Sequence, residues 1–470
     1  MTDPDPRRWR VLAVTQAAGF MSLLDVSIVN VALPSIRADL GAGPGGIQWV
    51  VSGYALTFGL SLVAGGRLGD ALGRRRMFLI ALTGFVLTSA LAGIAPSLLW
   101  LVVARLLQGL TGGLLTPQNS GLIQDLFHGP ERGRAFGVLG ATIGVSTAVG
   151  PIVGGLILAA AGGPAGWRWV FFVNLPIGVV ALALALRLVP RLDARGRADI
   201  DVVGALLLGA AVLGVLFPLV QVDNGGLAHL WWLFPIAVVI GWSFLRWEHR
   251  VVRLGRAPLL DTRLFTETPG YRAGAGIGLA YFCGFSGVWL VFAVFFQSGL
   301  GYTPLESGLA VTPFAIGGAV AAAVAGPLVA RWGRLITVLG LGTVGIGFAV
   351  VALVLLAEPA HAVGLWIAAP MALAGIGGGA VISPNTTLTL SEVPNQLAGV
   401  AGGVLQTGQR IGTAIGTATL AAVYQAVLGG SGHYPLAIAT ALFAAVAIIA
   451  VAFALAVRDW RADRAPVPAG

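Results

Sequence analysis

Long apolar runs follow one another along almost the whole chain. Each is about 20 residues long, the length that a helix needs to cross the hydrocarbon core of a bilayer. Short charged or Gly/Pro-containing segments separate the runs, without the polar/apolar alternation of a membrane β-barrel. The pattern predicts fourteen spanning helices, over residues 11–33, 47–66, 77–95, 98–119, 136–159, 170–188, 202–221, 230–247, 273–297, 308–330, 335–357, 362–384, 398–424 and 435–457. We therefore expect an all-α polytopic membrane protein.

Composition agrees with this pattern and excludes several chemistries. Of the 470 residues, 57% are hydrophobic and 10% are charged, with a mean hydropathy of +0.89. Soluble domains have roughly 45–50% apolar and about 25% charged residues. All 28 Lys+Arg residues are arginine. The absence of lysine excludes a phosphate-binding loop of the P-loop type and a cofactor held as a Schiff base. The single cysteine, Cys283, excludes an internal disulfide and a cysteine metal site. We expect no cofactor, no metal and no enzymatic activity.

The arginines orient the predicted spans. If the N-terminus is cytoplasmic, 24 of the 28 arginines lie inside, Arg37 and Arg168 lie outside, and Arg105 and Arg410 lie within spans. This is the positive-inside pattern, so we expect both termini in the cytoplasm. The sequence pI near 10.8 then reflects topology, and the expected partner is the bilayer, not a nucleic acid. The first span is too long, and lacks the cleavage site, for a cleaved signal peptide.

Internal matches at a nearly constant offset divide the chain into two halves. The turn at 66–74 recurs at 326–334, an offset of 260, and shorter matches follow at offsets of 266 and 267. Such repeats are typical of transporters built from two related halves. We predict four parts: a six-helix half over 1–199, an insert with spans 7 and 8 and a cytoplasmic loop over 200–268, a second six-helix half over 269–458, and a cytoplasmic tail over 459–470.

Charged positions differ between the two copies. Asp70 of the first copy corresponds to Ala330 of the second, and Arg105 corresponds to Ala372. The turns and glycines are kept while these charges are lost. We therefore expect the ion chemistry to be concentrated in the first half.

Five motifs occur in order along the predicted spans. In chain order they are a first-span motif from Leu24 to Pro34, a loop motif at Gly66, Leu68, Asp70, Gly73, Arg74 and Arg75, a fourth-span pattern at Leu101, Arg105, Gln108 and Gly109, a G-P-x-x-G-G motif at Gly150, Pro151, Gly154 and Gly155, and a block from Trp167 to Gly178. On these residues the chain resembles the major facilitator superfamily, and within it the fourteen-spanning drug:proton antiporter family. The fourteen-spanning peptide symporters, whose E-x-x-E-R signature is absent, and the usually twelve-spanning sugar porters fit less well. The resemblance covers about residues 10–458 and implies two six-helix bundles plus two inserted helices in a bacterial cytoplasmic membrane.

Asp25 is the only carboxylate well inside a predicted span. An acid there costs about 2.5–3.5 kcal/mol on insertion scales and as a rule faces a cavity or a partner. At about 1.5 Å per residue, Asp25 lies about 20 Å from the inner end of span 1, and Arg105 about 10 Å from the outer end of span 4. In a core about 30 Å thick these heights coincide. We predict that Arg105 pairs with Asp25, or alternates near it, and that the two couple proton binding to transport. The alternatives are an aspartate and an arginine that only satisfy hydrogen bonds within the bundle.

The loop that carries Gly66, Asp70, Gly73 and Arg74 is interpreted as a conformational latch. Asp70 can accept hydrogen bonds from a neighbouring helix N-terminus, where the helix dipole favours an anion. Arg74 can pair with a carboxylate on the cytoplasmic face. Such contacts would hold an outward-open state and break when it closes. A solvated charged turn is the alternative.

The G-P-x-x-G-G motif predicts a bend in span 5. Pro151, after Gly150, removes one backbone donor, while Gly154 and Gly155 permit close helix approach. The second copy has Thr417 opposite the proline, so the bend belongs to the first half. Simple helix packing is the alternative.

Polar and aromatic residues within the spans are candidates for a substrate cavity. They are Asn30, Tyr54, Gln108, Asn119, Trp289, Gln297, Asn385, Gln406 and Arg410. An unpaired guanidinium in lipid is expensive, so we expect Arg410 to face the cavity or the interface between the halves. Whether Arg410 contacts substrate is left open.

The sequence thus favours a secondary active exporter of small lipophilic or amphipathic compounds, such as drugs and antibiotics. It would exchange them for protons by alternating access of the two halves, as a monomer. Family members that handle dicationic drugs are expected to carry an acid in the tenth span, but residues 308–330 contain none, so neutral or monocationic substrates are favoured. The alternative is an exporter of a lipid, siderophore or other metabolite on the same fold. A non-transporting receptor should lack the buried Asp25.

Overall fold

The computed structural model describes most of the chain. Its described residues are 7–42, 44–191, 201–220, 229–254, 258–260, 263–266, 268–302, 304–357, 363–391, 393–394 and 397–463. Within these ranges every assigned element is a helix, as the apolar pattern predicts. A helix bonds its backbone groups internally, which is what a chain in lipid requires.

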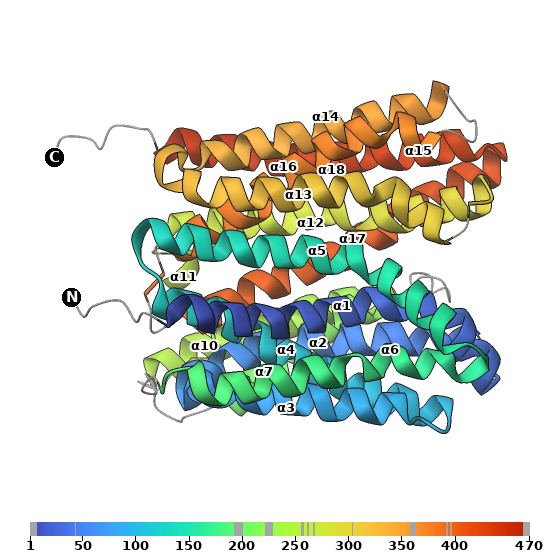
Figure 1. The fold of residues 1–470 in the computed structure, drawn as a ribbon. Helices are drawn as coiled ribbons and strands as arrows, with labels where there is room; N and C mark the ends of the chain where they lie inside the picture. The colour runs from blue at the N-terminus through green and yellow to red at the C-terminus, as the bar shows by residue number, and fades with distance from the viewer. Residues whose placement is uncertain are drawn as a thin grey trace. The chain divides into compact units, whose positions relative to one another are not determined.

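Eight elements precede the insert, and most of them are labelled in Figure 1. They are α1 (Arg8–Leu40), α2 (Pro44–Leu72), α3 (Arg74–Gly93), α4 (Leu98–Leu126), α5 (Gly129–Ala161), a 3-10 turn η1 with α6 (Pro164–Trp167 and Arg168–Phe172), and α7 (Asn174–Leu188). The two main helices of the insert are α8 (Val202–Val220) and α10 (Leu233–Arg253).

The second half of the chain repeats this pattern of long helices. Its elements are α11 (Arg263–Thr266), α12 (Pro269–Val294), the π-helical turn η3 (Phe295–Gly299), α13 (Pro304–Trp332), α14 (Leu335–Ala357), α15 (Val363–Trp366), α16 (Ala368–Ser391), α17 (Ala398–Ser431) and α18 (Tyr434–Asp463).

Ten helices of the described chain are long and apolar enough to cross a membrane. They coincide with ten of the fourteen predicted spans. The other four predicted spans fall on helices that do not meet this test over their described residues: α5, α8, α10 and the pair α15 and α16. The protein is therefore an all-helical, multi-pass membrane protein, and the count of fourteen spans stays a prediction.

The chain forms two compact units. The first unit comprises Met1–Phe127, Ser146–Arg263 and Pro394–Thr407, and the second comprises His128–Val145, Leu264–Val393 and Gly408–Gly470. The inserted helices thus belong to the first unit. There α8 packs on α2, with the rings of Trp49 and Phe217 5.7 Å apart.

Two glycines let α4 approach α2 closely in the first unit. A Cβ atom on Gly109 would lie 2.3 Å from the Tyr54 carbonyl oxygen, and one on Gly113 would lie 2.3 Å from the Phe58 carbonyl oxygen. No side chain fits at such distances, so these positions require glycine.

The second unit repeats this close approach. Cβ atoms on Gly375 and Gly379 of α16 would lie 2.0 Å from the Phe314 carbonyl oxygen and 2.2 Å from the Gly318 carbonyl oxygen, both on α13. Each glycine of α16 follows its counterpart of α4 by 266 residues, an offset already present in the sequence matches. The same helix pair is therefore built in the same way in both units.

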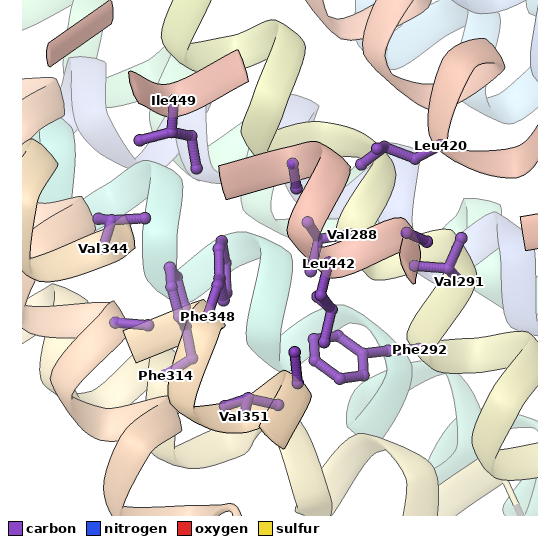
Figure 2. Close-up of a cluster of buried hydrophobic side chains, with 14 of the residues drawn as sticks. Val288, Val291, Phe292, Phe314, Val344, Phe348, Val351, Leu420, Leu442 and Ile449 are labelled. Carbon is purple, nitrogen blue, oxygen red and sulfur yellow. The ribbon is translucent and has the colours of Figure 1, made fainter. Parts of the chain in front are cut away.

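The core of the second unit is aromatic and β-branched. Val288 and Phe292 of α12, Phe314 of α13, Phe348 of α14 and Leu442 of α18 pack in one cluster (Figure 2). Four helices thus share a single apolar core.

A polar clamp closes one end of the inserted helix pair, just beyond the predicted eighth span. Asp201 accepts a hydrogen bond at 2.8 Å from the N–H of Gly204, in the first turn of α8. It accepts a second at 2.8 Å from the Trp247 indole. Glu248 is fully buried beside it and accepts from the Leu260 N–H at 3.1 Å. Burial, helped by the charge of Asp201, raises the pKa of Glu248 to about 7.

Candidate functional site

A buried ion pair lies inside the first unit. Arg105 of α4 contacts Asp25 of α1 through its Nη1 atom and the carboxylate Oδ2 atom, and the two side chains are 1% and 0% exposed. The structure thus brings together the two residues that the depth estimate placed at one level. Removing two charges from solvent is costly unless the remaining donors and acceptors are also satisfied.

Both carboxylate oxygens of Asp25 are occupied. Oδ1 accepts from Gln108 Nε2 at 3.1 Å and from Asn174 Nδ2 at 2.9 Å, while Oδ2 takes Arg105. The donors come from α4 and α7. Neither oxygen of the buried carboxylate is therefore left without a hydrogen-bond partner.

Arg105 is anchored equally well. Its Nε atom donates to the Val50 carbonyl at 3.0 Å, and Nη1 also donates to Gln108 Oε1 at 2.7 Å. The guanidinium lies over the Tyr54 ring, 4.2 Å from its centroid, and the Tyr54 hydroxyl donates to the Ser22 carbonyl at 3.2 Å. The arginine therefore joins α4 to α2 as well as to α1.

Apolar layers lie along α1 on both sides of this polar site. One cluster contains Val14, Ala18 and Met21 before Asp25, and another contains Ile28 and Ala32 after it. Between such layers the effective dielectric constant is low, so charges interact strongly.

The loop motif forms a second ionic network at the junction of α2 and α3. Asp70 Oδ2 accepts from the Val400 N–H at 3.0 Å, at the start of α17, where backbone donors are free and the dipole favours an anion. Asp70 Oδ1 pairs with Arg74 Nη2 at 2.9 Å, and Arg74 Nε pairs with Asp125 Oδ2 at 2.7 Å. Asp70, Arg74 and Asp125 are all buried, so the network is not a solvated turn.

Glycines position this network. Gly73 has a φ of +92°, which other residues rarely adopt, and it starts α3 so that Arg74 follows at once. A Cβ atom on Gly121 of α4 would lie 1.4 Å from Arg74 Nη1, so the guanidinium crosses α4 at a glycine. Gly66 is buried in α2.

The second unit has its own ion pair at the equivalent turn. Arg334, the repeat counterpart of Arg74, pairs with Asp459 of α18. The second copy therefore keeps an ionic contact at this turn, although Ala330 replaces the aspartate of the motif. In the first copy the carboxylates that pair with Arg74 come from α2 and α4. In the second copy the carboxylate that pairs with Arg334 comes from the last helix, α18.

The G-P-x-x-G-G motif packs α5 on α1 beside the buried pair. A Cβ atom on Gly150 would lie 2.0 Å from Ser27 Oγ, and one on Gly154 would lie 3.0 Å from Ile28 Cγ1. A Cβ atom on Gly155 meets nothing within 4 Å. α5 continues through position 151, and the side chain of Pro151 lies outside the described residues. The bend in span 5 stays a prediction.

The cavity candidates fall into different surroundings. Tyr54 and Gln108 belong to the Asp25 site. Asn385 is buried and donates to the Gly274 carbonyl at 2.9 Å, and Gln406 donates to Ser120 Oγ at 3.3 Å. The remaining candidates differ in exposure: buried Asn119, half-buried Trp289 and Arg410, and exposed Asn30 and Gln297.

Trp289 belongs to an aromatic group in the second unit. The centroid of its ring lies 4.8 Å from that of Phe314 and 5.4 Å from that of Phe285. Phe285 in turn stacks on Tyr281, with their ring centroids 5.1 Å apart. The Tyr281 hydroxyl is buried and has no hydrogen-bond partner among the described residues. Flat apolar surfaces next to an unused polar group are suited to an aromatic ligand that carries a polar substituent.

Among the residues of these networks, Asn174, Ser89 and Asp125 were not predicted from the sequence. Asn174 lies in the block Trp167 to Gly178, and Asp125 lies at the inner end of α4. A signal existed for Asn174, because it is the one amide side chain in an otherwise apolar span. Asp125 lies at the end of a helix, where a carboxylate is not unusual, so its position in the sequence did not indicate a partner.

The same block anchors α1 beyond its span. Asp39 Oδ2 accepts from the Trp167 indole at 2.9 Å and from Arg168 Nη1 at 2.8 Å. These two donors hold the pKa of Asp39 below its usual value.

Comparison with known proteins gives consistent matches. The family model described as Major Facilitator Superfamily matches residues 17–417. The "Probable actinorhodin transporter" of Streptomyces coelicolor is 38% identical over 431 residues, which are 91% of this chain and 74% of that protein. The "Puromycin resistance protein pur8" of Streptomyces alboniger is 35% identical over 425 residues, 89% of this chain and 82% of that protein. The crystal structure of the human organic anion transporter MFSD10 (TETRAN) matches with a TM-score of 0.69 at 15% identity, covering 96% of this chain and 100% of that one.

Proposed function

Since the chain belongs to the major facilitator superfamily, we propose that it is a secondary active exporter of small lipophilic or amphipathic compounds, driven by proton antiport. The relatives named as an antibiotic transporter and a resistance protein support the substrate class. The fourteen-spanning drug:proton antiporter family is the proposed subfamily, and an exporter of a lipid, siderophore or other metabolite is the alternative. The transporter would act as a monomer without a cofactor, with both termini in the cytoplasm.

The buried pair of Asp25 and Arg105 carries this proposal. Asp25 can bind and release a proton, and it sits between apolar layers with its charge matched by one cation. At an effective dielectric constant near 20, two unit charges 4 Å apart attract by about 4 kcal/mol, and protonation removes this term. A change of about 4 kcal/mol in interaction energy is enough to shift a conformational equilibrium.

The proposed cycle uses this exchange. A proton from outside adds to Asp25, Arg105 is released from the neutral acid, and the transporter changes to the inward-facing state. Loss of the proton to the cytoplasm restores the ion pair. The network of Asp70, Arg74 and Asp125 would serve as the latch that holds the outward-open state, because Asp70 binds the free end of α17.

The aromatic group of the second unit supports the substrate side of the proposal. The rings of Phe285 and Trp289 are half-buried beside the buried ring of Phe314, and described residues 308–325 of α13 bring no carboxylate among them. A flat neutral or singly charged compound is therefore the proposed substrate.

The test is proton-driven uptake of ethidium, a flat monocation, into inside-out membrane vesicles from an efflux-deficient bacterial host. Asp25→Asn should abolish the uptake that an imposed pH gradient drives. Asp39→Asn is the matched control, because it also removes a carboxylate of α1 that pairs with an arginine, but outside the apolar layers. It should keep most of the wild-type rate.

A gradient-driven rate in Asp25→Asn equal to that of the wild type would refute the proton-coupling role. A resistance panel of neutral and monocationic antibiotics in the same host tests the substrate class. Protection by the wild type and none by Asp25→Asn supports drug export, whereas no protection against any compound would favour the metabolite exporter.

A further inference from the structure

Resting on the proposed proton-coupling role of Asp25, we propose that Asn174 is a positioning residue that sets how tightly Asp25 binds its proton. Asn174 begins α7 and lies in the tryptophan-rich block from Trp167 to Gly178. Its amide nitrogen donates to Asp25 Oδ1 at 2.9 Å and to Ser89 Oγ at 2.9 Å. The asparagine is fully buried.

Its neighbours fix the orientation of the amide. The Ser89 hydroxyl donates its single proton to the Phe171 carbonyl at 3.0 Å, so its oxygen can only accept from Asn174. The ionised carboxylate of Asp25 is also an acceptor. A flipped amide would face two oxygens with its own oxygen, so only the nitrogen-inward orientation is stable.

This orientation leaves the amide oxygen without a partner. Asn174 Oδ1 is buried and has no hydrogen-bond partner among the described residues. An unpaired buried acceptor is unfavourable, and the amide tolerates it because both N–H groups are used, one of them on a charge. The arrangement is therefore built around an ionised Asp25.

The backbone around Asn174 holds it in place. Pro176 has no N–H, so the Phe172 carbonyl four residues before it loses its helical partner, and α6 ends there before α7 begins. A Cβ atom on Gly178 would lie 2.2 Å from Val86 Cγ2, so α7 is pressed against α3. The asparagine thus joins the outer helices α3 and α7 to the carboxylate on α1.

The consequence for transport is a shift of the working pH. Removing the Asn174 donor takes away one hydrogen bond that favours the carboxylate over the acid, while Arg105 and Gln108 remain. Asp25 would then hold its proton more tightly and release it at higher pH. A hydrogen bond to a charged group corresponds to a shift of about one pH unit.

The test follows the proton on Asp25 directly and needs no substrate. Infrared difference spectra of the purified protein in nanodiscs, titrated with acid and base, report the C=O stretch of protonated carboxyl groups. The band that disappears in Asp25→Asn belongs to Asp25. In Asn174→Leu, which keeps the size and removes the donors, the midpoint of this band should move about one pH unit upward. Asn174→Gln, which keeps the donors, should restore most of the wild-type midpoint.

Gln118→Leu is the matched control for loss of a buried amide. Gln118 is equally buried, but it donates to the Gly65 and Leu114 carbonyls rather than to Asp25, so the midpoint should not move. Asn174→Ala provides a second variant if the leucine disturbs folding, which size-exclusion profiles reveal. An unchanged midpoint in well-folded Asn174→Leu and Asn174→Ala overturns the role of Asn174 but leaves the proposed function intact. If no titrating band is lost in Asp25→Asn, the proton-coupling proposal itself fails.

Discussion

The energetic role of Arg105 gives the sharpest prediction about stability. Replacing it by glutamine removes the cation from a buried carboxylate, which keeps only Gln108 and Asn174 as donors. It also removes the bond to the Val50 carbonyl and the contact with the Tyr54 ring. Breaking a buried ion pair from one side costs about 3–5 kcal/mol, whereas an ordinary hydrogen bond between membrane helices averages about 0.6 kcal/mol. We therefore expect Arg105→Gln to lower the free energy of unfolding by about 3–5 kcal/mol.

A double-mutant cycle separates the ion pair from simple packing. Asp25→Asn together with Arg105→Gln leaves no unpaired charge, so the loss should be smaller than that of Arg105→Gln alone, with a coupling of about 2–3 kcal/mol. The assay is unfolding of the purified protein in mixed detergent micelles, followed by tryptophan fluorescence. The half-exposed pair of Arg168 and Asp39 is the control and should couple by less than about 1 kcal/mol. Losses for the buried pair that add to within about 0.5 kcal/mol would show that Asp25 and Arg105 are not energetically coupled.

Three further predictions follow from the two ionic networks and the insert. Gly73→Ala should destabilise the protein by about 1–3 kcal/mol because φ is +92°, while Gly155→Ala, with nothing within 4 Å, should be neutral in the same thermal unfolding assay. Arg74→Ala leaves two buried carboxylates without their cation, so export should fall at least tenfold and the unfolding temperature should drop. Because the pKa of Glu248 is raised from about 4.5 to about 7, the folded state binds more protons than the unfolded state between these values. Wild-type stability should therefore fall as pH rises from about 4.5 to 7, and Glu248→Gln should remove this part of the pH dependence; parallel curves for both proteins would contradict it.

The helical spans were predictable because each depends on local sequence. A run of about 20 apolar residues meets the membrane requirement by itself, and backbone hydrogen bonds within the run complete the helix. The ends were less predictable: α17 continues to Ser431, beyond the expected end at 424, because a helix does not stop where its surroundings become polar. The number of spans that cross the membrane stays a prediction, because α5, α8, α10 and the pair α15 and α16 are not long and apolar enough over their described residues.

The candidate site was predictable only in part. Asp25 and Arg105 stand out because charges inside apolar spans are costly, and their depths can be counted from the span ends. Asn174 and Ser89 were not found, although they join α7 and α3 to the same carboxylate. A depth count says nothing about which helices are neighbours.

The network of Asp70, Arg74 and Asp125 shows the same limit. The motif indicated that Asp70 binds a helix N-terminus and that Arg74 binds a carboxylate, but it did not identify either partner. The structure identifies Val400 and Asp125. The Asp70 partner lies 330 positions away along the chain. Local propensity carries no information at such a separation.

An all-helical membrane fold, an internal repeat and the burial of charge within the spans can be predicted from the order of the amino acids alone. These properties follow from the free-energy cost of placing polar groups in lipid. Each helical segment satisfies its own backbone polar groups, so this cost can be considered segment by segment. The donors that surround Asp25, the helix end that Asp70 binds and the packing of α8 on α2 became known from the folded arrangement of the helices. Those contacts depend on the lateral order of the helices, which is set by close approach at residues such as Gly109 and Gly113 rather than by hydropathy.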